Sequence, residues 1–162
     1  MFWIWSVIGL RCGMPGCEDA AVKVLLDTCV ISELRRSNGD RRVREAVERF
    51  SSEDLFLSVL SIGEIARGIG LLAEGRKKQG LGNWMKTVMQ LYGDRVLPVD
   101  LETSRLWGEL TAAAGRLGKG IPVADGLIAA TARRHGLQVM TRNTADFEWT
   151  GVVVINPWTV VV

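Results

Sequence analysis

Short apolar runs alternate along the chain with longer segments whose apolar residues recur at helical spacing. The short runs are rich in β-branched residues and predict strands at residues 22–26, 55–59, 95–99, 137–140 and 152–155. Pro98 indicates that the third run forms a sheet edge or a strand end. Because parallel neighbouring strands need crossover helices, this alternation predicts an α/β fold, a three-layer sandwich with a mainly parallel central sheet flanked by helices.

The clearest helix signals lie in residues 121–147. Pro122 suits a first helical turn, Gly136 suits a helix end, and basic residues occupy the turn before that glycine. The predicted helix has Asp125 in its first turn and is followed by a strand and a polar loop. The helix dipole stabilises a carboxylate in such a position by about 0.3–1 kcal/mol. Asp125 taken alone therefore needs no functional explanation.

Two other acids lie where a predicted strand passes into a predicted helix. Asp27 directly follows the first strand and suits the N-cap of the next helix, where its loss typically costs about 1 kcal/mol. Glu64 stands three residues after Ser61, and Ser-x-x-Glu before an apolar run is a capping box. This motif predicts that the helix begins at Ser61, with Glu64 in its first turn.

Considered together, the three acids suggest a site that binds a metal ion. In a parallel α/β fold, Asp27, Glu64 and Asp125 all fall at the carboxyl edge of the sheet, where such folds bind their ligands. Carboxylates brought together without a cation repel and raise one another's pKa values. A hard divalent ion held through oxygen, Mg²⁺ or Mn²⁺, would relieve that repulsion. Such an ion can activate water, so no Ser, Cys or His nucleophile is required.

Composition limits the remaining possibilities. The chain has 162 residues, 48% hydrophobic and 23% charged, which suits one globular domain. A net charge of +2 is too small to indicate nucleic-acid binding by itself, although residues 67–86 hold five basic residues against one acid and are either a phosphate-contacting band or a solvated helix face. Three cysteines are an odd count, which makes a poor disulfide framework and favours a reduced, cytoplasmic setting.

The N-terminal segment, residues 1–21, is interpreted as an extension outside the domain. Residues 2–10 are apolar but fall short of the ~20 residues that a membrane span needs, and no positive region precedes them. We interpret the segment as a mis-called start, with Met14 as the true first residue. An interfacial anchor and a lipidation site at residues 14–17 are the alternatives. The domain is expected to occupy residues 22–158, followed by a tail at residues 159–162.

Four motifs, in their order and spacing, resemble PIN-domain ribonucleases of the VapC toxin family. They are VLLDTCVISEL at residues 24–34, SVLSIGEI at residues 58–65, ADGLIAA at residues 124–130 and TRNT at residues 141–144. The resemblance covers residues 22–158, and the part from Arg95 to Trp158 looks most like the FitB-like branch. It implies a PIN-like fold and a Mg²⁺-dependent endoribonuclease toxin of a type II toxin–antitoxin system, which hydrolyses RNA phosphodiester bonds. Asp27, Glu64 and Asp125 match the family's metal-binding catalytic acids.

The same resemblance implies partners and exposes two departures. The implied partners are an RNA substrate, a second copy of the chain in a homodimer, and a cognate VapB-like antitoxin that occludes the site and alone carries the contact to DNA; no membrane is implied. An apolar groove for the antitoxin is expected between residues 30–34 and 65–72. Cys29 stands where Asn is commoner, which changes the bonding around the metal ligands. Asn143 stands where a fourth Asp is frequent, so Asn143 and Asp146 are additional metal-site candidates.

Two other classes of function remain open at this stage. The chain could be a non-catalytic partner subunit of a DNA-binding toxin–antitoxin regulatory complex, in which the acids receive a basic side chain of the partner. It could also be a phosphoacceptor of the receiver-domain kind, but that class needs a Lys after a late strand, and Thr141-Arg142 supplies none. His135 is interpreted as a dipole partner at a helix end or a core residue, and Cys29 as a small buried hydrophobe.

Overall fold

The computed structural model describes residues 22–159, so the interpretation of residues 1–21 and most of the expected tail lie outside the described part. Its centre is a five-stranded sheet in which every neighbouring pair is parallel, with the order β3-β2-β1-β4-β5. The strands are β1 (Val24–Leu26), β2 (Leu55–Ser58), β3 (Val96–Leu97), β4 (Gln138–Met140) and β5 (Val154–Ile155). The predicted parallel sheet is confirmed. The strands are shorter than predicted, and Pro98 ends β3 at a sheet edge.

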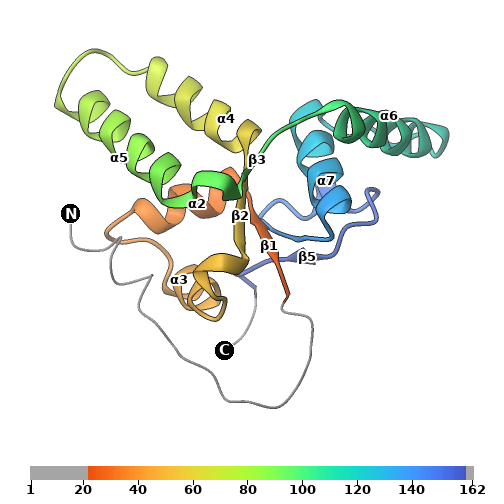
Figure 1. The fold of residues 1–162 in the computed structure, drawn as a ribbon, viewed down its shortest axis with the longest axis horizontal. Coiled ribbons are helices and arrows are strands. Elements are labelled where there is room, and N and C mark those ends of the chain that lie inside the picture. Colours follow the sequence, from red (N-terminus) through yellow and green to blue (C-terminus); the bar gives the residue numbers. More distant parts are fainter. Residues whose placement is uncertain (1–21, 160–162) are drawn as a thin grey trace.

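Helices cover both faces of this sheet. They are α2 (Thr28–Arg35), α3 (Arg41–Glu48), α4 (Val59–Gly70), α5 (Arg76–Tyr92), α6 (Leu101–Arg116) and α7 (Val123–His135). Figure 1 shows α4 and α5 as a hairpin that projects to one side, with α6 and α7 on the other. Short 3-10 turns, η1 (Ser52–Asp54), η2 (Gly93–Arg95) and η3 (Ala145–Phe147), join some of these elements. The three-layer α/β sandwich is therefore confirmed.

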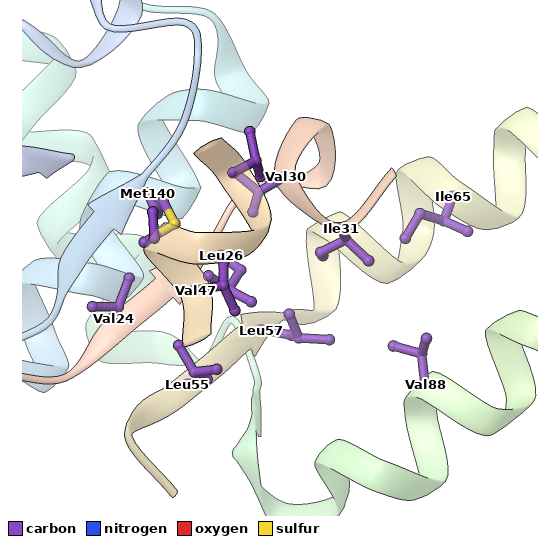
Figure 2. Close-up of a cluster of buried hydrophobic side chains, with 12 residues drawn as sticks. Val24, Leu26, Val30, Ile31, Val47, Leu55, Leu57, Ile65, Val88 and Met140 are labelled. Carbon is purple, nitrogen blue, oxygen red and sulfur yellow. The ribbon is translucent and has the colours of Figure 1, made fainter. Parts of the chain in front are cut away.

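Alternation along β1 divides the core between the two faces of the sheet. Val24 and Leu26 pack with Val30, Val47 and other side chains of α2, α3, α4 and α5, as Figure 2 shows. Leu25 packs on the other face in a cluster supplied mainly by α6, α7 and β4. All three β1 residues are fully buried. A strand buried on both faces reads as a continuous apolar run, which is why residues 22–26 are recognisable in the sequence.

None of the helices between residues 22 and 159 combines the length and apolarity that crossing a bilayer would require.

Candidate active site

The register of the three central strands brings distant parts of the chain to one level. Leu26 at the end of β1 pairs with Leu57 on one side and with Met140 on the other. The residues that follow are Asp27, Ser58 and Thr141, and the Asp27 amide donates to the Met140 carbonyl at 3.0 Å. The carboxyl edge of the sheet therefore places polar side chains from three separate segments next to one another.

Asp27 is held firmly at this edge. It is buried, with 7% of its surface exposed, and caps α2 by accepting a 2.6 Å hydrogen bond from the Thr28 amide. Its second oxygen, Oδ2, accepts from the Thr141 hydroxyl at 2.6 Å and from the Cys29 thiol at 3.2 Å. A buried carboxylate needs such donors. The predicted cap is present, and it is only one part of a network that fixes the direction of this carboxylate.

Cys29 supports Asp27 and does not act as a nucleophile. Burial, followed by the negative charge of Asp27, raises the pKa of the Cys29 thiol to about 11. The protonated thiol therefore persists at neutral pH, whereas nucleophilic attack needs the thiolate. Its sulfur also accepts a 3.4 Å hydrogen bond from the Arg142 amide. Cys29 thus connects the first turn of α2 to the loop after β4.

The predicted capping box around Glu64 is wrong. Helix α4 begins at Val59, and the Ser58 hydroxyl caps it by accepting from the Leu60 amide at 3.2 Å. Ser58, rather than Ser61, is the N-cap because its backbone at the strand end is extended, which is the conformation that an N-cap needs. Ser61 is consequently a buried residue inside the helix, and its hydroxyl has no hydrogen-bond partner among the described residues.

Glu64 therefore lies in the second turn of α4, where helix capping does not account for it. The side chain is exposed, and its Oε2 accepts a 2.5 Å hydrogen bond from the Thr28 hydroxyl. Because Thr28 directly follows Asp27, this bond brings the Glu64 carboxylate from α4 toward the end of β1.

Asp125 lies in the first turn of α7, as predicted, and the negative charges of the other acids affect the pKa of its carboxyl. Partial burial raises the pKa of its carboxyl to about 6, with further contributions from the negative charges of Asp146, Asp27 and Glu64, in that order. Three carboxylates from other segments are therefore near enough to Asp125 to influence its pKa. Asp146, one of the two additional metal-site candidates, contributes more to this electrostatic effect than either of the other two acids.

The loop after β4 is attached to the same network. The Asn143 amide donates to the Thr141 hydroxyl at 3.0 Å, and the Asn143 side chain donates to Asp146 Oδ2. Thr141 in turn donates to Asp27. Asn143 is exposed and holds Asp146, while Asp146 provides a negative charge beside Asp125.

Comparison with known proteins identifies the fold. The PIN domain model matches residues 24–150. The chain belongs to the PIN-domain family. It is 40% identical over 136 residues to VapC ribonuclease Y4jK of Sinorhizobium fredii, which covers 83% of this chain and 97% of that relative. It is also 38% identical over 136 residues to Toxin FitB of Neisseria gonorrhoeae, with coverage of 83% and 98%.

Solved structures agree with this assignment. In the structure of FitAB bound to IR36 DNA fragment, the matching chain has a TM-score of 0.81 and 37% identity, and the match covers 86% of this PIN-domain chain and 98% of that chain. The expected family and its FitB-like branch are therefore confirmed.

Two site residues of this PIN domain were not selected from the sequence. Thr28 bonds Glu64, and Thr141 bonds Asp27. The sequence offered one signal for each residue. Thr28 directly follows a candidate ligand acid, and Thr141 follows a strand that pairs with the strand of that acid. Threonine is common in both contexts for purely structural reasons, so only the contacts distinguish these two residues.

The donor set of the PIN domain suits a hard divalent cation. Asp27, Glu64, Asp125 and Asp146 offer only oxygen ligands, and among the described residues none of these four acids forms an ion pair. Residues 22–159 contain no group of three or more Asp, Glu, His or Cys side chains already arranged to hold a metal ion. Glu64 is turned toward Thr28 and Asp146 toward Asn143, so these exposed or half-buried side chains would need to reorient around an ion.

We expect Asp125→Asn to stabilise the metal-free protein. The folded pKa of Asp125 is raised above its usual value of 3.8 to about 6, so folding favours the protonated form, and stability from this group falls as the pH rises through that interval. Because solvent screens this partly exposed carboxyl, we expect only about 1 kcal/mol from the shift. At neutral pH in EDTA the uncharged amide should therefore raise the melting temperature by about 2–4 °C.

Thermal unfolding of the parent and of Asp125→Asn, in EDTA and in MgCl₂, measures this effect. The same variant should lose most of the stabilisation that Mg²⁺ gives to the parent, because ligand binding stabilises the folded state by mass action. A variant less stable than the parent in EDTA would show that the helix-dipole interaction outweighs the repulsion.

Proposed function

We propose that this PIN-domain chain is a metal-dependent endoribonuclease toxin that hydrolyses phosphodiester bonds of RNA. The observation that supports this proposal most strongly is that Asp27, Glu64 and Asp146 are near enough to Asp125 to raise its pKa, while none of the four forms an ion pair among the described residues. Structural N-caps would not need to share one edge of the sheet. The name of the 40% identical relative, VapC ribonuclease Y4jK, agrees with this activity.

In the proposed mechanism, Asp27, Glu64 and Asp125 would hold Mg²⁺ or Mn²⁺. Such an ion would act as a Lewis acid toward a phosphate oxygen and would lower the pKa of water. The protein residues orient the metal ligands. The Thr141 hydroxyl and the Cys29 thiol donate hydrogen bonds to the Asp27 carboxylate, and the Thr28 hydroxyl donates to Glu64. The negative charge of Asp146 strengthens the attraction for a cation beside Asp125.

Cleavage of labelled RNA by the purified chain tests the proposal directly. Products should form with MgCl₂ or MnCl₂ and be absent with EDTA. Metal-independent binding of a partner without any cleavage would instead favour the alternative, a non-catalytic subunit of a DNA-binding toxin–antitoxin complex. Because cellular RNA is the proposed substrate, we also assign the chain to the cytoplasm.

The proposed antitoxin site is a groove between α2, α4 and α5. A cavity of about 250 Å³ lies there, lined by Ser32, Arg35, Ile69, Trp84 and neighbouring residues, and Thr28 and Glu64 form part of the same lining. An amphipathic segment could place apolar residues on Ile69 and Trp84 while its end reaches Glu64. The 37% identical neighbour is part of FitAB bound to a DNA fragment, which agrees with a partner that carries the DNA contact. Pairing of the toxin chain with itself stays a prediction.

The loop after β4 gives a graded test of the metal site. We expect Asn143→Asp to lower the Mg²⁺ concentration for half-maximal cleavage, because the number of charged ligands sets affinity for hard cations. Asp146→Asn should raise that concentration by roughly tenfold, which corresponds to about 1.4 kcal/mol, since it removes the charge with the largest electrostatic effect on Asp125.

Magnesium titrations of both variants measure these shifts. Because Asn143 donates to Asp146 in the parent protein, Asn143→Asp also removes a hydrogen bond. The double variant Asn143→Asp/Asp146→Asn restores a donor and an acceptor in exchanged positions and serves as the control. Unchanged midpoints in both single variants would place the loop outside the reach of the metal.

A further inference from the structure

Two loops meet beside the amino end of α7 through a cation–aromatic contact. Lys119 belongs to the loop between α6 and α7, and Trp149 belongs to the loop between η3 and β5. The Lys119 ammonium lies 4.9 Å from the centre of the Trp149 ring. The contact joins the segment that precedes α7 to the segment that follows η3.

Backbone contacts hold both loops in place. Gly118 has a φ of +68°, a left-handed conformation that suits glycine, and the Lys119 amide donates to the Ala114 carbonyl at 3.0 Å, so the loop continues directly from the cap of α6. On the other side, Phe147 is buried with α7 residues in the core, and the Thr150 amide donates to its carbonyl at 3.1 Å. Trp149 is thus carried on a turn anchored to α7.

The pair lies close to the proposed metal site. The loop of Lys119 leads into the first turn of α7, which holds Asp125, and Trp149 lies three residues after Asp146. Asp146 is near enough to Asp125 to raise its pKa. Two acids of the proposed metal site, Asp125 and Asp146, therefore lie in the segments that carry Lys119 and Trp149.

Both side chains are available to a ligand. Trp149 keeps 38% of its surface exposed, so part of this large aromatic side chain is open to solvent. Lys119 is exposed and makes no ion pair within residues 22–159. Because the ammonium group contacts a ring and not a carboxylate, no negative charge of the described residues neutralises it, and it can attract an anion.

We propose that Lys119 and Trp149 form a subsite for single-stranded RNA, in which a base stacks on Trp149 and the adjoining phosphate contacts Lys119. This inference rests on the proposed ribonuclease function and identifies two residues that would position the substrate strand. An exposed ring accepts an unpaired base, whereas bases in a duplex are stacked on each other, and a lysine beside that ring is placed for the backbone phosphate. The subsite positions the strand near the carboxylates and takes no part in the bond-breaking step.

Binding and cleavage of a short labelled single-stranded RNA test the subsite in the full chain. Trp149→Leu should raise both Kd, measured in EDTA by fluorescence anisotropy, and KM by about fivefold or more, with kcat nearly unchanged. This factor is the lower end of the range that base–aromatic stacking gives. Trp149→Phe should retain most of the affinity because it keeps a ring. RNA should also quench tryptophan fluorescence in the parent, and Trp149→Phe should lose most of that quenching.

Two lysine variants distinguish a specific phosphate contact from the loss of a positive charge anywhere on the surface. Lys119→Gln should reduce the slope of log K against log salt concentration by about 0.7, the contribution of one phosphate contact in a single strand. The control is Lys23→Gln. Lys23 also lies over an aromatic ring, 5.9 Å from the centre of Phe56, but precedes β1 at the opposite edge of the sheet. Its slope should match the parent.

The outcomes distinguish this subsite from the proposed function. If the parent cleaves RNA while Trp149→Leu and Lys119→Gln keep the parent KM, salt slope and quenching, the subsite is excluded and the ribonuclease function stands. The Lys119–Trp149 contact would then have only a structural role, joining the two loops. If the parent neither binds nor cleaves RNA, both proposals are overturned. Double-stranded RNA binding as tightly as single-stranded RNA would also exclude the subsite.

Discussion

Asp27→Asn, Glu64→Gln and Asp125→Asn should each abolish Mg²⁺-dependent RNA cleavage while leaving the domain folded. Each substitution removes one negative oxygen ligand from the proposed metal site and changes the side-chain volume little. A bound metal contributes several kcal/mol to the transition state, and each 1.36 kcal/mol is a factor of ten, so we expect losses of about a thousandfold or more. Cleavage assays at saturating Mg²⁺, with circular dichroism as the folding check, measure this.

Asp40→Asn is the matched control for capping. Asp40 caps α3 by accepting from the Arg42 amide at 2.9 Å, and α3 lies away from the carboxyl edge of the sheet. The variant should lose about 1 kcal/mol of stability or less and keep full activity. If any two of the three site variants were as active as Asp40→Asn, the acids would be explained as structural residues and the metal-site proposal would fail.

The sequence was sufficient to predict the layers of the fold and two of the acid positions. Buried parallel strands are continuous apolar runs, and Asp27 and Asp125 lie beside a strand end and a helix start that local signals mark. The position of Glu64 was predicted through an incorrect local motif. Ser58 and Ser61 both precede an apolar run, and only the extended backbone at the end of β2 decides that Ser58 is the cap.

The contacts of the site could not be predicted from local patterns. The Thr141–Asp27 hydrogen bond spans 114 residues, and the Thr28–Glu64 hydrogen bond spans 36. Both depend on the order of the sheet, with β1 between β2 and β4. The electrostatic role of Asp146 depends on the packing of η3 against α7, which the composition of the loop alone could not predict.

The groove variant Gly68→Trp should weaken the antitoxin complex. Gly68 lines the groove between α2, α4 and α5, and a β-carbon added there meets nothing within 4 Å. A tryptophan can therefore be introduced without backbone strain, and its ring occupies space that the antitoxin segment would need. Overpacking of an interface typically costs about 1–3 kcal/mol, or about 5- to 150-fold in Kd. Where a small open reading frame lies beside the gene, co-expression with its product, followed by co-purification, measures complex formation.

Two glycine variants of the same helix control for side effects of this substitution. Gly68→Ala should keep the complex and stabilise the free protein by up to about 1 kcal/mol, because glycine is a poor helix former. Gly70→Trp adds the same large side chain at an exposed position that is not among the groove-lining residues, and a β-carbon there also meets nothing within 4 Å. It should keep the complex as well. Loss of binding in Gly68→Trp alone, with toxicity no longer relieved by the neighbouring gene, would locate the partner in the groove, whereas intact binding in all three variants would place the partner elsewhere on the domain.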